Sequence, residues 1–232
     1  SNLVIVVDDL ERCAMPISDV LGFLNPLVEH DGFKIILLAN QAEIAASEDG
    51  SYRQKREKLV GQVLAVRPDV NAAFGSFLES MACETTRSYL SQNSYVVSAV
   101  YEQSATCNLR ALKHTLLSFE RLYMQLSETH RNNTAAMKAL LSMYLAIGLE
   151  HQIGQISGHD LETRKFGLIL ALARHNCTGA ADSTYKDPFD ALERKYVDVD
   201  LRSEMLSNAT LKSIFSVGVI DIKHISLDLS QS

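Results

Sequence analysis

The sequence lacks the residue patterns of metal-binding and disulfide-rich proteins. Its four cysteines, Cys13, Cys83, Cys107 and Cys177, are scattered and form no C-x-x-C pair. This spacing argues against a zinc site and against a disulfide framework, so we expect buried or partly buried free thiols in a reducing cytoplasm. The seven histidines do not pair at metal-ligand spacing either, and no H-E-x-x-H occurs.

Long hydrophobic runs are also lacking. No apolar stretch approaches the roughly 20 residues that span a bilayer, and we expect no signal peptide. Hydrophobic residues make up 47% and charged residues 22% of the 232 residues, which is ordinary for a soluble globular protein. The net charge of -6 argues against a dedicated nucleic-acid surface. We therefore expect a cytoplasmic protein that does not bind nucleic acid directly.

Two apolar segments near the N-terminus predict a parallel sheet. The run Leu3–Val7 shows no polar alternation, so both faces of this strand should be buried, and a second run covers residues 33–39. Residues 17–29 between them are expected to form a helix, which gives one right-handed βαβ unit. Two strands alone cannot bury both faces, so we expect the chain to begin inside a larger domain.

The rest of the sequence is predicted to be mainly helical. A polar helix over residues 45–58 should lead into a short strand, residues 62–66, and Pro68-Asp69 then marks a domain boundary. Beyond it, apolar residues recur at three- and four-residue spacing over 70–89, 95–102, 109–126, 133–153 and 160–175. In the tail we expect a helix over 211–219 and a short strand over 219–222.

Two acidic residues follow directly after the first predicted strand. Asp8 and Asp9 would lie at the carboxyl end of a parallel strand, the edge at which open α/β sheets bind ligands. One carboxylate there can hold Mg²⁺, largely through water, and a second can polarise a water that attacks a phosphate. The alternative is a strand that simply ends in an Asx turn.

The surrounding residues carry a family resemblance. The string V-I-V-V-D-D-L-E-R-C, residues 4–13, resembles the Walker B segment of KAP-type and related STAND P-loop ATPases. The segment Ile35–Asn40 resembles the sensor-1 strand of AAA+ proteins. Residues 108–113, N-L-R-A-L-K, resemble the start of the lid helix that carries the sensor-2 arginine, although Leu109 takes the place of the usual small residue or proline.

The resemblance implies a nucleotide site with ATP and Mg²⁺ as cofactors. In it, Asp8 is the magnesium ligand, and Asp9 stands where AAA+ proteins usually keep a catalytic glutamate. Asn40 would be sensor 1, and Arg110 sensor 2. All four would therefore contact the nucleotide, its metal or the attacking water.

Four further charged residues are less informative. Arg53 and Arg56 lie where an AAA+ arginine finger is found, and the alternative is a solvated charged helix face. Glu11 and Arg12 follow the family string, but no role follows for them. The alternative is that these two residues form an exposed ion pair.

One departure from the family is large. No G-x-x-x-x-G-K-[ST] motif occurs, and no glycine precedes a lysine. That loop supplies the backbone N–H cradle and the lysine that bind phosphate. Since it precedes Walker B in the family, we expect an N-terminally truncated chain. The resemblance extends over residues 3 to about 115 and loses specificity along the way.

The sequence therefore predicts an α/β fold followed by an all-α one. Residues 1–68 would be part of a P-loop NTPase (ASCE-type) parallel sheet, 69–126 a helical lid and 127–232 a helical C-terminal region. The expected function is ATP hydrolysis by the intact protein, coupled to assembly or switching. Family analogy adds bacterial antiphage defence, with a homo-oligomer or proteins of the same operon as partners. The alternative is a non-catalytic helical interaction module on an ATPase-like remnant.

Overall fold

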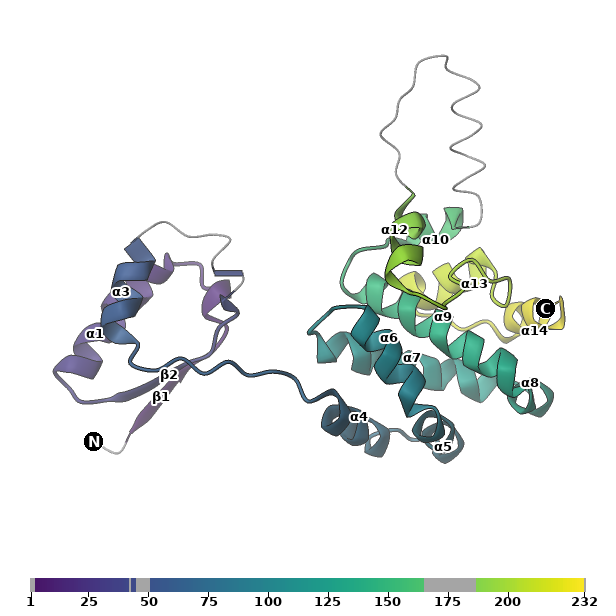
Figure 1. Ribbon diagram of the computed structural model, residues 1–232, viewed down its shortest axis with the longest axis horizontal. Coiled ribbons are helices and arrows are strands. Elements are labelled where there is room, and N and C mark those ends of the chain that lie inside the picture. The colour runs from purple at the N-terminus through teal and green to yellow at the C-terminus, as the bar shows by residue number, and fades with distance from the viewer. Residues whose placement is uncertain (1–2, 42, 45–50, 165–186, 232) are drawn as a thin grey trace, which may run out of the picture. The chain divides into compact units, whose positions relative to one another are not determined.

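The computed structural model describes residues 3–41, 43–44, 51–164 and 187–231. The chain divides into two compact units, residues 1–66 and residues 67–232 (Figure 1). We call the first the α/β unit and the second the helical unit, and each is described by itself.

The α/β unit is built on two parallel strands. β1 (Val4–Val7) pairs with β2 (Lys34–Leu37) in a register that aligns Val4 with Lys34 and Val7 with Leu37. Helix α1 (Ile17–Glu29) connects the two strands, and α3 (Ser51–Leu59) packs against α1. The predicted βαβ unit is confirmed, because a crossover helix of this length brings the second strand back parallel to the first.

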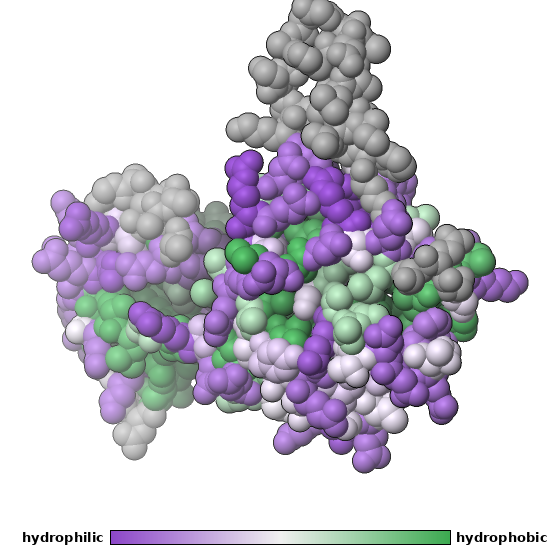
Figure 2. Space-filling model, turned by 45° about the vertical axis from the view of Figure 1, so that its right-hand side comes forward, coloured by the Kyte–Doolittle hydropathy of each residue, from purple (hydrophilic) through white to green (hydrophobic). Residues whose placement is uncertain are grey.

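The two faces of this sheet differ in burial. Ile5, Val7, Ile35 and Leu37 are half-buried. The alternate residues Val4, Val6 and Ile36 point the other way and are 46%, 56% and 50% exposed. A hydrophobic area is visible on the α/β unit, at the left of Figure 2. The expectation that both faces are buried is wrong for the described residues, because a two-stranded sheet has no further layer on that side.

The segment after α3 forms no strand. Residues 62–66 are irregular, and Val63, Leu64 and Val66 are exposed, Val66 to 91%. The predicted strand is therefore wrong in this structure. An apolar, β-branched sequence becomes a strand only where a neighbouring strand accepts its hydrogen bonds, and none among the described residues does so.

The helical unit contains one hydrophobic core. Its elements are α4 (Val70–Glu79), α5 (Glu84–Gln92), α6 (Ser94–Gln103), α7 (Leu109–Gln125), α8 (Glu128–Asn132), α9 (Thr134–Gln152), α10 (Gly158–Thr163), α12 (Pro188–Lys195), α13 (Asn208–Lys212), η2 (Ser213–Val217) and α14 (Ile222–Gln231). Helices α6 and α7 pack against α9, which is buried over most of its length. The buried residues of this core range from Phe74 to Ile225 in the sequence. They lie on both sides of residue 126, at which the helical lid was predicted to end. The predicted change along the chain from an α/β region to an all-helical region is confirmed for the described residues.

The helix predicted over residues 70–89 is two helices. α4 ends at Glu79 and α5 begins at Glu84, because tertiary contacts satisfy the backbone between them. The Cys83 N–H donates to the Glu120 carboxylate at 2.7 Å, and the Arg87 guanidinium donates to the Met81 carbonyl at 3.0 Å. Glu120 lies on α7, 37 positions along the chain, and local sequence periodicity does not predict its contact with Cys83, whereas Arg87 lies on α5 itself.

The tail also differs from expectation. The helix expected over 211–219 is the end of α13 followed by η2, a π-helical turn that Gly218 ends with a φ of 79°. No strand forms over 219–222, because the Val219 N–H bonds to the Ser213 carbonyl at 3.0 Å and Ile222 begins α14. Of the helix predicted over 160–175, residues 160–163 belong to α10, while residues 165–175 lie outside the described part of the chain.

Cys13, Cys83 and Cys107 are free thiols. Cys13 and Cys107 are exposed, so the expectation of buried thiols is wrong for these two, and Cys177 lies outside the described residues. None of the described helices has the length and apolar character needed to cross a membrane.

Candidate functional site

The carboxyl ends of β1 and β2 are joined by backbone hydrogen bonds beyond the strands themselves. The Leu38 N–H donates to the Val7 carbonyl at 2.8 Å, and the Leu10 N–H donates to the Leu38 carbonyl at 3.3 Å. The Leu10 side chain is buried, which anchors the turn after β1. The two loops that carry the predicted site residues therefore leave the sheet side by side.

Asp8 and Asp9 lie at this edge with exposed side chains. The Asp9 N–H donates to Asp8 Oδ1 at 2.9 Å. Asp9 has a φ of 51° and a ψ of 45°, in the left-handed region, and is followed by the short 3₁₀ helix η1 (Leu10–Arg12). Non-glycine residues are uncommon in this region, although Asp tolerates it better than most. The tight reversal turns the chain immediately after the two carboxylates.

Asn40 occupies the corresponding place after β2. Its backbone N–H donates to Glu11 Oε2 at 3.0 Å, and its carbonyl accepts from the Ile44 N–H at 3.1 Å. Its side-chain Nδ2 donates to Glu43 Oε1 at 2.9 Å. The structure thus brings together the turn after Asp8-Asp9 and the residue predicted to be sensor 1.

Glu11 is the residue of this edge to which sequence reasoning assigned no role. The Asn40 N–H is the main reason that the pKa of the Glu11 carboxyl is lowered, and its own backbone N–H and the nearby Arg12 act in the same direction. Arg12 lies 3.7 Å from the Asp9 carboxylate in an exposed ion pair. The alternative of a Glu11–Arg12 ion pair is therefore wrong: Glu11 bonds to Asn40, 29 positions along the chain. No local sequence pattern predicts a contact between residues that far apart in the chain.

The three arginine candidates lie on helices. Arg53 is exposed and Arg56 half-buried, both on α3. Arg110 is an exposed residue in the first turn of α7, whose N-terminus is capped by the Asn108 side chain accepting from the Ala111 N–H at 3.0 Å. A finger role for Arg53 or Arg56 and a sensor-2 role for Arg110 stay predictions.

The strand ends fit magnesium better than they fit a whole nucleotide. No group of three or more His, Cys, Asp or Glu side chains in the described residues forms a metal cage. Mg²⁺ at phosphate sites does not require one, because it binds one or two carboxylates and takes its other ligands from phosphate and water. An exposed carboxylate such as that of Asp8 suits this role. The glycine-rich cradle for the phosphates is not among residues 1–232.

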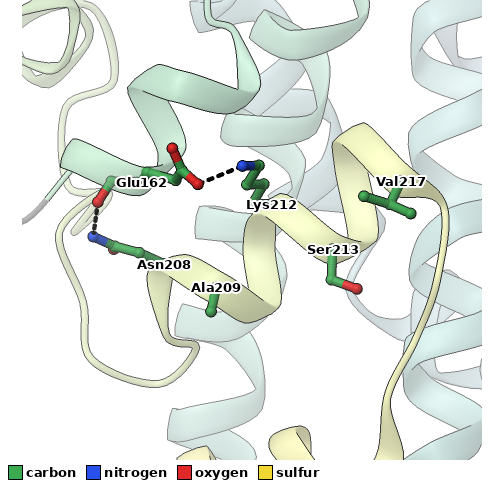
Figure 3. A pocket seen from close by; sticks show the side chains of 6 residues that line it. All are labelled: Glu162, Asn208, Ala209, Lys212, Ser213 and Val217. Carbon is green, nitrogen blue, oxygen red and sulfur yellow. Dashed lines mark hydrogen bonds and ion pairs between the residues drawn. The ribbon is translucent and has the colours of Figure 1, made fainter.

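A separate open pocket of about 500 Å³ lies in the helical unit, on α10, α13 and η2 (Figure 3). Its polar groups already bond to protein atoms. Glu162 pairs with Lys212, Asn208 Nδ2 donates to the Glu162 carbonyl at 2.7 Å, and Ser213 Oγ donates to the Val219 carbonyl at 2.9 Å. A pocket whose polar groups are bonded in this way offers little to a ligand, so the strand ends remain the candidate site.

Comparison with known proteins shows the family of the chain. The family model described as the KAP family P-loop domain matches residues 1–126, more than half of the chain. The match contains both strands and ends at Leu126, the residue that follows α7. No curated protein and no solved structure matches the chain significantly. The chain belongs to the KAP family of P-loop NTPase domains.

Proposed function

We propose that the protein is a magnesium-dependent ATPase and that its α/β unit supplies the metal and water side of the catalytic site. P-loop NTPases as a class bind and hydrolyse nucleotides, and the family match supports that general activity here. The observation that carries the proposal is the pairing of the two strand ends. Asp8-Asp9 and Asn40 leave adjacent parallel strands and are connected through Glu11.

Each residue has a distinct task in the proposed site. Asp8 would hold the cation, and Mg²⁺ bound there would neutralise charge on the phosphate oxygens. Asp9 accepts a hydrogen bond from the attacking water and orients it. Asn40 donates from Nδ2 to the terminal phosphate or to that water, which requires it to exchange its present bond to Glu43. Because Asp9 is one methylene shorter than glutamate, we expect slow hydrolysis.

Residues 1–232 contain no G-x-x-x-x-G-K-[ST] motif, and the proposal takes the phosphate cradle from elsewhere, so the test uses the full-length protein. We expect Mg²⁺-dependent release of phosphate from ATP by the wild type and a fall of about 100-fold or more in kcat for Asp9→Asn. Nucleotide affinity should change little, because the carboxylate acts on water rather than on ATP. The matched control is Asp31→Asn, which alters an exposed aspartate in the loop before β2.

Two results would contradict the proposal. Equal activity in the wild type and Asp9→Asn would remove Asp9 from the mechanism. Absence of both hydrolysis and ATP binding in the wild type would leave the strand-end acids structural. The second result would favour a non-catalytic module that uses its helical unit for interaction.

We extend the proposal to nucleotide-controlled assembly, with a second copy of the chain or a product of the same operon as partner. Arg53, exposed on α3, would then act on a neighbouring subunit's nucleotide. An increase in molecular mass on adding a non-hydrolysable ATP analogue, measured by light scattering, tests the assembly. Family analogy alone supports a role in antiphage defence, and phage plating on cells with wild-type or Asp9→Asn protein tests that role.

A further inference from the structure

Glu11 joins the two halves of the candidate site. It lies in η1, two positions after Asp9, and its Oε2 accepts the backbone N–H of Asn40 at 3.0 Å. The two backbone hydrogen bonds that also join these strand ends, from Leu38 to Val7 and from Leu10 to Leu38, could be made by any sequence. Glu11 adds a side-chain contact between the turn that follows β1 and the loop that follows β2.

Both ends of this contact are anchored in the unit's small core. On one side, Leu10 is 3% exposed and its N–H bonds to the Leu38 carbonyl. On the other side, the Asn40 carbonyl accepts the N–H of Ile44, which is 1% exposed. The Asn40 backbone is therefore held at its N–H by Glu11 and at its carbonyl by Ile44. Loss of Glu11 would leave one of these two restraints.

We propose that Glu11 is a positioning residue that sets the distance of Asn40 from Asp8 and Asp9, so that the sensor side chain and the acids engage the same phosphate and water. This inference rests on the proposed ATPase function. Glu11 does not contact the substrate in this proposal and acts through the Asn40 backbone. Because a hydrogen bond to an ionised acceptor is shorter and stronger than a neutral one, a carboxylate suits the task better than an amide.

The kinetic test compares full-length wild type with Glu11→Ala and Glu11→Gln. A misplaced catalytic group lowers kcat, and displacements near 1 Å can cost up to about 100-fold. We expect a loss of about 10-fold in kcat for Glu11→Ala with KM for ATP changed by less than about 2-fold, since the affected interaction strengthens only in the transition state. Glu11→Gln keeps an acceptor oxygen and should recover part of the loss.

The matched control is Glu29→Ala. Glu29 is an exposed glutamate of the same unit that accepts a hydrogen bond from Asn25 Nδ2 at 2.9 Å. It lies at the end of α1 that leads into the start of β2, the opposite edge of the sheet. Its removal should leave kcat and KM unchanged. Wild-type activity in Glu11→Ala, or an equal loss in Glu29→Ala, would overturn the proposal.

A second readout does not depend on activity. In full-length protein labelled with ¹⁵N-asparagine, the Asn40 amide signal is identified by its loss in Asn40→Gln. Its shift should follow titration of Glu11 at a pH below the usual range of glutamate, because the Asn40 N–H lowers the pKa of that carboxyl. The titration should vanish in Glu11→Gln.

The two readouts separate the possible failures. An Asn40 amide that does not titrate overturns the Glu11–Asn40 connection, even if the protein hydrolyses ATP. A titrating amide in a wild-type protein that does not hydrolyse ATP contradicts the proposed function instead. Glu11 then connects the two loops without an effect on catalysis.

Discussion

The two units of this protein use their hydrophobic residues differently. In the described part of the α/β unit the buried hydrophobic side chains are Leu10, Leu21, Leu24 and Ile44, while one face of its sheet is half exposed. In the helical unit a continuous core connects α4 to α14. Apolar burial is the main favourable contribution to folding. The helical unit therefore carries most of the stability visible in this structure.

Their polar residues differ as well. At the strand ends the acids are exposed. In the helical unit Glu150 and Arg164 are fully buried. Glu150 Oε1 accepts from Lys195 at 2.7 Å and from Tyr196 at 2.5 Å, which ties the end of α9 to α12. The comparison teaches that the polar groups of the candidate site are accessible and can change partners, whereas buried polar groups hold the helical unit together.

The largest expected effect comes from Arg164. Its guanidinium donates to the carbonyls of Leu201 at 2.6 Å, Ser203 at 3.0 Å and Leu206 at 2.8 Å, and burial lowers its pKa to about 10. Arg164→Met keeps the volume but leaves these acceptors without a donor, so we expect a loss of about 3 kcal/mol of unfolding free energy. Urea unfolding followed by helical circular dichroism measures it.

The control for that variant is Arg194→Met, an exposed arginine on α12, which should change stability by less than about 0.5 kcal/mol. Similar losses in both variants, or a more stable Arg164→Met protein, would break the contrast between a buried polar framework and an exposed polar site.

A smaller effect is expected where α7, α9 and η2 meet. A Cβ at Gly148 would overlap the Thr115 methyl group and approach the Phe215 ring to 3.0 Å. We expect Gly148→Ala to destabilise the helical unit by about 2 kcal/mol through overpacking. Gly75 on α4 has open space around it, so Gly75→Ala should be neutral or slightly stabilising. If thermal unfolding ranked the two variants in the reverse order, the close packing of this core would be in doubt.

The smallest effect concerns pH. Burial of His151, whose ring lies 6.0 Å from that of Phe215, lowers its pKa. Above the unfolded value of about 6.5 the ring is neutral in both states and costs nothing. As pH falls below 6.5, the unfolded chain binds the proton first, so stability is lost until pH passes the lowered folded value.

His151→Gln should flatten this acid slope in the unfolding free energy between neutral pH and pH 5, whereas His114→Gln, which alters an exposed residue of α7, should keep it. An unchanged slope in His151→Gln would show that other groups govern the acid sensitivity of the helical unit.

Local patterns predicted the elements whose partners are near in sequence. β1, α1 and β2 follow from two apolar runs and one crossover, and α7 and α9 from their helical periodicity. The errors occur where a distant partner decides. Residues 62–66 have the composition of a strand, but no described segment pairs with them, and the helix expected over 70–89 breaks where Glu120, on α7, accepts the Cys83 N–H.

The same distinction applies to the candidate site. Asp8, Asp9 and Asn40 were identifiable from sequence, because polar residues directly after apolar strands must lie at one edge of a parallel sheet. Glu11 was not, because its partner is chosen by the register of β1 with β2 and by the anchoring of Leu10.

By itself, the sequence determined that a parallel βαβ unit precedes a helical region and that two acids follow the first strand, since periodicity and chain connectivity are local properties. Only the tertiary structure decided that Glu11 binds Asn40, that Arg164 is buried among carbonyls and that one sheet face stays exposed. Each of these depends on which surfaces meet, and the free energy of burial and hydrogen bonding is decided only when they do.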